Sequence, residues 1–413
     1  MVENLLLITY LLGVSPIATA TPPKPVDPAI LKSMAKSALS SVENLRGQKL
    51  SKPLKSGVKK KPEVTRFITE RLADEYGPAK VQAEGDLLKL LGLIPTGLDY
   101  GDFMTRLLTE QVAGFYDHTR QELYLADWIP LFLQEPVMAH EIFHAIQDQE
   151  WGGGKLIDSK RYSHDEVLAH AALMEGDATV VMLMHTAVKA GGSGDDVSPF
   201  MLNMMAATIP LQMSSAEYPV MTGAPDYIKQ SLVFPYQHGI SFLAALRTTG
   251  WTWADFRKLY ADPPASTEQI LHPERYAPTR DEPSRVTVAL PKGFTRTWDG
   301  VAGELHFRQV LLTNRPTGDA IEAAAGWDGD FTALLTDDRR QVIECVSTWD
   351  SEADAIAYAT ALQAWDTARA PAGKPKLALE RKGSALYYTL STDALLANET
   401  LSSLPLRTKI VIR

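Results

Sequence analysis

The stretch "VMAHEIFHAIQDQE", residues Val137 to Glu150, places two histidines four positions apart with a glutamate directly after the first, which is the pattern H-E-x-x-H. Pro136 suits the first turn of a helix, and the apolar side chains that follow it give the helix a broad face to bury. The stretch is therefore predicted to be a helix that begins near Pro136.

The spacing within this helix suits a metal ion. Residues four apart on a helix stand one above the other, so the imidazoles of His140 and His144 can converge on one ion. Glu141 lies about 100° around the axis from His140, close enough to reach a metal-held water without binding the metal itself. Because the pattern arises by chance in about one such chain in a hundred, its context has to decide. The context favours a site, since a strand predicted at Glu122 to Ala126 ends shortly before the helix.

A third ligand is predicted in "SHDEVLAHAALMEGDATVVMLMHTAV", Ser163 to Val188, which is expected to form one long helix. A catalytic zinc usually has three protein ligands and one position left for water. Glu175 stands in an apolar part of this helix, where burying an unpaired carboxylate is costly and a cation would compensate. Glu175 is therefore the favoured third ligand. The alternatives are Asp158, Glu166 and Asp177.

Composition limits the kind of partner. The chain has 413 residues, 45% of them apolar and 22% charged, with a net charge of -9 at pH 7. Its only dense basic run, Lys49 to Lys61, is interpreted as a solvated linker, so no nucleic acid is expected as a partner. Cys345 is the only cysteine, so no intrachain disulfide can form and any metal site must be built from His, Asp and Glu.

The N-terminus resembles an export signal. Leu5 to Val14 is an apolar run of signal-peptide length, and Ala18-Thr19-Ala20 has the small-x-small form that signal peptidases cut. Cleavage after Ala20 and a secreted or periplasmic location are predicted, with no membrane span afterwards because no later apolar run is long enough. Glu3 stands where a basic residue is expected, which leaves a misassigned start or a membrane-retained anchor as the alternatives.

The chain is predicted to be a mainly helical α+β protein in four parts. Residues 1–20 are the signal peptide, 21–62 an N-terminal arm and basic linker, 63–282 the catalytic domain, and 283–413 a smaller C-terminal α+β region. This organisation follows from helical periodicity in the middle of the chain and strand-like alternation near its end.

Individual elements follow from the same patterns. Helices are predicted over residues 63–110, and a hairpin over 112–126. In the C-terminal region, strands are predicted at 284–291, 330–337 and 340–349, a helix at 351–365, and a hairpin that turns at Lys382-Gly383.

The motifs also resemble a known family. "HEIFH" followed by "EGDAT" resembles the gluzincins, zinc metallopeptidases such as the thermolysin-like enzymes, whose third zinc ligand is a glutamate on a second helix. More closely, the motifs "QVAGFYD", "AHEIFHAIQDQ", "LMEGDAT", "FPYQHG", "STEQILHPERY" and "GWDGD" follow in this order from about Val112 to Asp330. Together they resemble a group of exported bacterial HExxH proteins of largely unassigned substrate. The resemblance implies a zincin-like catalytic core made of an edge strand, the HExxH helix and a second ligand-bearing helix.

The function is predicted from the motif and the resemblance together. His140, His144 and Glu175 would bind one catalytic Zn²⁺, and Glu141 would be the general base in the hydrolysis of a peptide or protein by zinc-activated water. The alternative is a non-catalytic exported binding or cell-envelope protein that retains a metalloprotease-like fold. A structural helix with a chance H-E-x-x-H is a third interpretation.

A peptidase also needs a donor for the oxyanion of its tetrahedral intermediate. "PPASTEQILHPERY" begins with a Ser266 to Gln269 capping pattern and predicts a short helix that holds His272 at its end. "LVFPYQHGISFLAAL" presents Tyr236 just before an apolar helix. His272 is the favoured donor, and Tyr236 is the alternative.

Several other features of the sequence allow either a functional or a purely structural interpretation. Thermolysin-like enzymes use an Asp to orient one zinc-binding histidine, but this chain has Thr179 at that position. Asp177 and Asp148 are the candidates for this role instead. The alternative, that both acids pair with neighbouring helices, has equal weight. The resemblance implies that the strand at Glu122 to Ala126 could bind an extended peptide. A methionine-rich run after Pro199 favours core packing over a substrate pocket or lid, and the aspartates of "GWDGD" favour a turn over a cation site.

Overall fold

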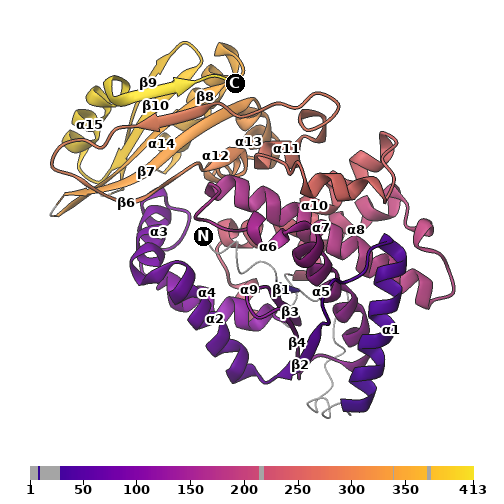
Figure 1. The fold of residues 1–413 in the computed structure, drawn as a ribbon. Helices are drawn as coiled ribbons and strands as arrows, with labels where there is room; N and C mark the ends of the chain where they lie inside the picture. Colours follow the sequence, from indigo (N-terminus) through magenta and orange to yellow (C-terminus); the bar gives the residue numbers. More distant parts are fainter. Residues whose placement is uncertain (1–7, 10–27, 214–217, 338, 370–373) are drawn as a thin grey trace.

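The computed structural model describes residues 8–9, 28–213, 218–337, 339–369 and 374–413 (Figure 1). The protein is α+β and mainly helical, as the sequence predicts. The predicted cleavage site after Ala20 and most of the predicted signal peptide lie outside the described residues.

Helices dominate the chain up to residue 282. They are α1 (Pro28–Arg46), α2 (Lys61–Glu75), α3 (Gly77–Leu91), α4 (Tyr100–Gln111), α5 (Leu131–Trp151), α6 (Gly153–Leu156), α7 (His164–Lys189), α8 (Pro199–Met213), α9 (Pro219–Thr222), α10 (Asp226–Thr248) and α11 (Thr267–Leu271), with short 3-10 turns η2 (Gly194–Asp196), η3 (Asp255–Tyr260) and η4 (Pro273–Arg275). The long helix predicted for residues 163–188 is confirmed as α7, and Ser163 caps it by accepting a hydrogen bond from the backbone N–H of Glu166.

A small sheet lies beside these helices, in the order β1-β3-β4-β2. Its strands are β1 (Ile8–Thr9), β2 (Lys55–Lys59), β3 (Gly114–Asp117) and β4 (Glu122–Ala126), and the predicted hairpin is confirmed as β3 and β4. The prediction that Glu122–Ala126 is an edge strand is wrong, because β4 pairs with β3 on one side and runs parallel to β2 on the other. A strand paired on both sides has no free backbone groups with which to add a peptide.

The predicted arm and linker contribute two elements to the core. Helix α1 packs against α5 and α7 and buries Ala38 and Val42 completely. The basic run that was interpreted as a solvated linker contains β2, which is held through backbone pairing with β4. Lysines on an outer strand are compatible with this pairing, because their side chains reach water while the backbone bonds inward.

Two positions predicted at helix starts lie inside helices instead. Helix α5 begins at Leu131, so Pro136 stands within it, where its ring nitrogen has no hydrogen to donate to the helix. Tyr236 was expected just before a helix but lies within α10, as does Pro235. Glycine ends α5 at Gly152, whose φ of 73° is the left-handed conformation that side chains disfavour.

Helices α7 and α10 cross at two glycines, Gly176 and Gly239. A methyl group at Gly176 would lie 2.5 Å from the backbone carbon of Gly239, and one at Gly239 would overlap the carbonyl oxygen of Ala172. The two backbones can therefore touch only because neither glycine has a side chain. This crossing brings α10 against the turn of α7 that carries Glu175.

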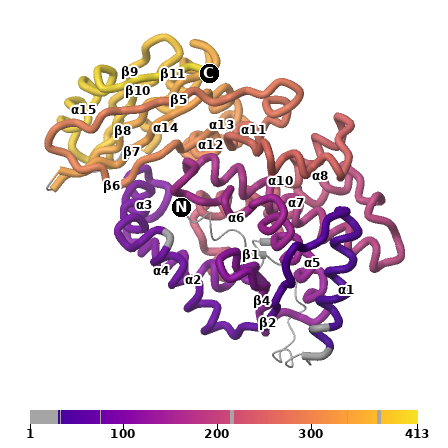
Figure 2. The backbone as a smooth tube through the Cα atoms, in the orientation of Figure 1, coloured from indigo at the N-terminus to yellow at the C-terminus, as the bar shows by residue number. Residues whose placement is uncertain are grey.

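The C-terminal region forms a five-stranded antiparallel sheet in the order β6-β7-β8-β10-β9, seen at the top of Figure 1. Its elements are β5 (Arg285–Val288), β6 (Thr295–Gly300), α12 (Gly303–Leu312), α13 (Thr317–Ala324), β7 (Trp327–Asp337), β8 (Arg340–Trp349), α14 (Glu352–Ala368), β9 (Lys376–Lys382), β10 (Ala385–Ser391), α15 (Ala394–Arg407) and β11 (Thr408–Val411). The strands, the helix and the hairpin that the sequence predicts here are confirmed. One apolar core runs from α1 through α5 and α7 to α12, α14 and β10, so this region shares its core with the helices. Figure 2 traces the backbone of both parts.

Two apolar features of the helices have a bearing on function. The prediction that no later apolar run is long enough to cross a membrane is wrong for α7, which alone among the described residues has the length and composition to do so. In the structure, 94% of its most apolar window is buried within the protein. In α8, Leu202, Ala206 and Ile209 are buried as core packing predicts, whereas Met201 and Met204 are exposed. The methionine-rich run is thus only partly explained by core packing.

Candidate metal centre

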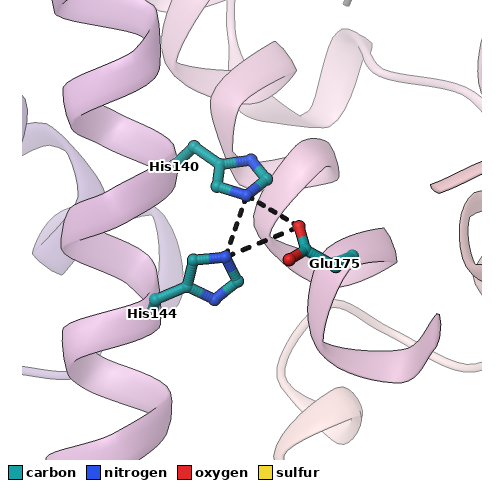
Figure 3. Close-up of side chains that lie close together, drawn as sticks. All are labelled: His140, His144 and Glu175. Carbon is teal, nitrogen blue, oxygen red and sulfur yellow. Dashed lines mark hydrogen bonds and ion pairs between the residues drawn. The ribbon is translucent and has the colours of Figure 1, made fainter. Parts of the chain in front are cut away.

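The two histidines of α5 and Glu175 of α7 converge on one point (Figure 3). The Nε2 atoms of His140 and His144 are 2.9 Å apart, and Glu175 Oε2 lies 3.0 Å from the first and 3.6 Å from the second. All three side chains are fully buried, at 0% exposure. The structure therefore brings together the three residues that the sequence predicts as ligands.

The donor set fits a zinc ion. Ligands held about 2.0–2.1 Å from a tetrahedral zinc are separated from one another by roughly 3.3 Å, close to the three distances seen here. Two buried atoms, His140 Nδ1 and Glu175 Oε1, have no hydrogen-bond partner within the described parts of the chain. Two nitrogen donors and one carboxylate are a common ligand set for catalytic zinc, which keeps a further position open.

Burial and charge set the protonation of the three side chains. Burial, with a contribution from His144, lowers the pKa of His140 to about 4. Burial also disfavours the charged form of His144, but the Glu175 carboxylate outweighs it and raises the pKa of His144 to about 9. Burial alone would raise the pKa of Glu175, yet the two imidazoles hold it below its usual value. The carboxylate is thus kept ionised in a buried place, as a cation ligand must be.

A chain of hydrogen bonds orients His144. Its Nδ1 donates to Gln147 Oε1 at 2.6 Å, which directs Nε2 toward His140 and Glu175. The Gln147 amide donates to Tyr260 Oη at 2.8 Å and to the carbonyl of Met174 at 2.9 Å. Such a partner fixes both the tautomer and the ring direction of a metal-binding histidine.

The chain continues to the N-terminal helix. Tyr260 Oη donates to Asp177 Oδ2 at 2.9 Å, and the same carboxylate forms a buried, two-bond ion pair with Arg46 at the end of α1. The Arg46 guanidinium also lies 4.8 Å from the ring centre of Phe143, which stands between the two histidines in sequence. Helix α1 is therefore linked to the candidate metal centre through Asp177, Tyr260 and Gln147.

Sequence reasoning missed Gln147 and Tyr260. Gln147 carried a signal, because it stands three residues after His144 and hence on the same face of α5. Tyr260 carried none, since it lies 113 residues away from Gln147 in the chain. Asp177 reaches His144 only through these two residues.

The other acidic candidates lie elsewhere. Asp148 accepts hydrogen bonds from Tyr116 Oη at 3.0 Å and from the Gly154 N–H at 3.2 Å. Asp158 accepts a hydrogen bond from the backbone N–H of Lys160. Glu166 accepts one from the backbone N–H of Ser163, the residue that caps α7. No described hydrogen bond or ion pair joins these three acids to His140, His144 or Glu175.

Glu141 and the two oxyanion candidates occupy different settings. Glu141 is fully buried on α5, and its charge contributes to the raised pKa of His144. His272 stands at the end of α11, where its Nε2 lies 3.1 Å from Glu304 Oε1 and accepts a hydrogen bond from Arg308 at 2.9 Å. No described contact joins His272 to the three predicted ligands, and Tyr236 is fully buried within α10. The oxyanion role of either residue stays a prediction.

The aspartates of "GWDGD" have structural partners. Asp330 is buried in β7 and accepts hydrogen bonds from the N–H groups of Ala302 and Gly303, at the start of α12. Asp328 accepts a hydrogen bond from the backbone N–H of Ser284. The favoured turn is wrong here, because both residues lie in the first part of strand β7, where they connect the strand to neighbouring segments.

Comparison with known proteins gives one match. A model described as a domain of unknown function, DUF8575, matches residues 293–395, about a quarter of the chain, from just before β6 to the first residues of α15. No curated protein and no solved structure matches the chain. The matched domain lies outside α5 and α7, so it assigns no role to the candidate metal centre.

Proposed function

We propose that the protein is a zinc-dependent metallopeptidase with a zincin-like core, resembling the gluzincins. The observation that supports this most strongly is the convergence of His140, His144 and Glu175 with ligand atoms 2.9 to 3.6 Å apart. The H-E-x-x-H pattern could occur by chance, but chance gives no reason for a carboxylate from a second helix to meet both imidazoles without another partner for its Oε1.

The roles of the residues follow from their chemistry. A zinc ion held by His140, His144 and Glu175 would supply a Lewis acid that makes water a nucleophile near neutral pH. Glu141, directly after the first histidine, would take a proton from that water and pass it to the leaving amine. Gln147 would keep the His144 ring in place, because its amide oxygen accepts from Nδ1.

A substrate strand has a possible place beside β3. Strand β1, which pairs with β3, lies within the predicted signal peptide. Cleavage after Ala20 would remove β1 and expose the hydrogen-bonding edge of β3, on the opposite side from β4. An extended peptide could then add to β3 as a new strand, which moves the predicted peptide-binding edge from β4 to β3.

The second candidate is a non-catalytic exported protein that retains the metal centre. The complete burial of His140, Glu141, His144 and Glu175 favours it, because a peptide bond has to reach these side chains to be cut. An exported, secreted or periplasmic location is part of both proposals.

Peptidase activity distinguishes the two. Purified protein is assayed with denatured casein and a peptide library, beside Glu141→Gln and the matched control Glu150→Gln, which lies at the far end of α5. A peptidase loses at least about 100-fold in rate in Glu141→Gln while keeping its zinc, and Glu150→Gln stays active. Inert wild type with one bound zinc would instead support the binding protein.

A further inference from the structure

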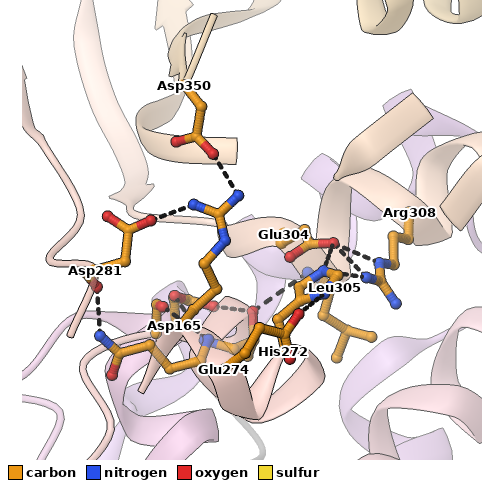
Figure 4. Close-up of polar contacts among 12 residues, drawn as sticks. Asp165, His272, Glu274, Asp281, Glu304, Leu305, Arg308 and Asp350 are labelled. Carbon is orange, nitrogen blue, oxygen red and sulfur yellow. Dashed lines mark hydrogen bonds and ion pairs between the residues drawn. The ribbon is translucent and has the colours of Figure 1, made fainter. Parts of the chain in front are cut away.

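A second group of carboxylates lies between α11 and the C-terminal sheet. It consists of Glu268 on α11, Asp281 in the segment before β5 and Asp350 directly after β8, and one oxygen from each lies within 4.8 Å of the others. Figure 4 shows Asp281 and Asp350 within this polar network. Three separate segments, one of them 69 residues beyond Asp281, thus place three acidic side chains around one point.

Arg275 compensates only part of this charge. Its guanidinium bonds Asp281 and also Asp350, the latter at 2.6 Å. Glu268 takes no part in these bonds: it is 1% exposed, and its Oε1 has no hydrogen-bond partner in the described chain. Three carboxylates and one guanidinium leave two negative charges when all are ionised. One of the three acids, Glu268, is buried with one oxygen that has no hydrogen-bond partner in the described chain.

The buried carboxyl group of Glu268 calls for a physical explanation. Burial, followed by the nearby Glu304 carboxylate, raises the pKa of Glu268 to about 9. Burial therefore disfavours the charged form of Glu268, and its Oε1 has no hydrogen-bond partner in the described chain. A divalent cation between the three carboxylates would restore the ionised form and provide the missing partner.

We propose that Glu268, Asp281 and Asp350 form a binding site for Ca²⁺. All three ligands are oxygens, which suit hard cations, and Ca²⁺ takes 6–8 of them at 2.3–2.6 Å. Ligands across such an ion are about 5 Å apart, which accommodates oxygens within 4.8 Å of one another. Asp281 and Asp350 are 34% and 27% exposed, so water can complete the coordination.

Arg275 occupies the position of a counter-ion in this site. Its side chain is 34% exposed, so it can move into solvent when the cation binds. Bound Ca²⁺ would connect α11, which packs against α7, to the end of β8 in the C-terminal sheet. The expected effect is a higher stability of the whole molecule, since the ion binds only where these segments are folded together.

The proposal is tested by calcium titration of the full chain. Protein is freed of metal on a chelating resin, reloaded with one equivalent of zinc and titrated with CaCl₂ in a calorimeter, while thermal unfolding is followed in parallel. Wild type is expected to bind one Ca²⁺ with a Kd on the order of 10⁻⁴ to 10⁻³ M and to unfold at a higher temperature with Ca²⁺.

Variants identify the ligands. Glu268→Gln and Asp350→Asn are expected to weaken Ca²⁺ binding at least ten-fold, and Arg275→Gln to strengthen it because the competing cation is gone. Asp102→Asn, which alters an exposed acid paired with Arg106, serves as the matched control. Glu175→Ala keeps the Ca²⁺ response if the site is separate from the metal centre. If Glu268→Gln does not fold, Asp281→Asn carries the same test at a partly exposed position.

Two results would overturn the proposal. One is wild type that binds no Ca²⁺ at 10-fold above the expected Kd range. The other is binding that is unchanged in the Glu268 and Asp350 variants, which would place the ion elsewhere.

Discussion

At the scale of single residues, one buried hydrogen bond decides how His144 is presented. Gln147 has two tasks, because its amide oxygen accepts from His144 Nδ1 while its amide nitrogen donates to Tyr260 and Met174. Neither hydrogen bond of Gln147 is a contact with the proposed metal ion, yet the direction of the His144 ring depends on both.

We predict that Gln147→Leu weakens zinc binding by about 10- to 100-fold, because the ring of His144 loses the acceptor that orients it. The affinity is measured by competition with a chromogenic chelator. Tyr260→Phe keeps Gln147 in place through the Met174 carbonyl and should have a smaller effect. Equal zinc affinity in wild type and Gln147→Leu would mean that the hydrogen bond does not orient the ligand.

Glu268 gives a prediction for pH dependence in calcium-free buffer. Its pKa is raised in the folded protein from an ordinary 4.5 to about 9, so its contribution to stability is fully present below about pH 4.5 and is lost as the pH rises through about 9. Glu268→Gln cannot ionise, so its free energy of unfolding should rise relative to that of wild type as the pH rises from 5 to 8, by up to about 4 kcal/mol. Denaturant unfolding of both proteins at several pH values measures the difference. A difference that does not change with pH would contradict the raised pKa.

At the scale of elements, two contacts hold the helices with the predicted ligands in place. One is the glycine crossing of α7 and α10, and the other is the ion pair between Arg46 of α1 and Asp177 of α7. Both depend on residues that are far apart in sequence.

The crossing tolerates no side chain. Gly239→Ala would force its methyl group into the carbonyl oxygen of Ala172, and we predict a loss of about 3 kcal/mol or more in the free energy of unfolding. Gly318→Ala is the control, because a methyl group there meets no atom within 4 Å. Chemical denaturation measures both, and comparable stability of the two variants would show that α7 and α10 do not cross this closely.

The ion pair is expected to matter because Asp177 is fully buried. Arg46→Ala leaves that carboxylate without its cation, which should cost about 3–5 kcal/mol. The exposed pair of Arg106 and Asp102 provides the comparison, and Arg106→Ala should cost about 1 kcal/mol or less. Similar losses in the two variants would mean that α1 is not anchored through Asp177.

The elements that the sequence predicts well are those with a local pattern. Helix α7 and the hairpin of β3 and β4 follow from periodicity over short stretches, as does the facing of His140 and His144 on one helix. The pairing of β2 with β4 and the position of Tyr260 depend on contacts between distant segments, which no local pattern records. The predicted start of α5 was wrong. Proline is typical of the first turn of a helix, but Pro136 lies five residues after the first residue of α5.

At the scale of the whole molecule, the candidate metal centre lies within one continuous apolar core. That core connects α1, the helices with the predicted ligands and the C-terminal region, which contains the matched domain of unknown function. The predicted division at residue 283 marks a change from helices to a five-stranded sheet, although one apolar core extends across both parts. The C-terminal region also has two smaller apolar clusters of its own. The two proposed ion sites both join segments of this shared structure.

The central claim is that one zinc ion is bound by His140, His144 and Glu175. Its most direct test is the zinc content of mildly purified wild type beside Glu175→Ala and the control Glu166→Ala, which alters only the cap of α7. We predict about one equivalent of zinc in wild type and in Glu166→Ala, and a large loss in folded Glu175→Ala, because a catalytic zinc rarely stays with two protein ligands. Less than about half an equivalent in wild type, or the same zinc content in Glu175→Ala, would contradict the claim.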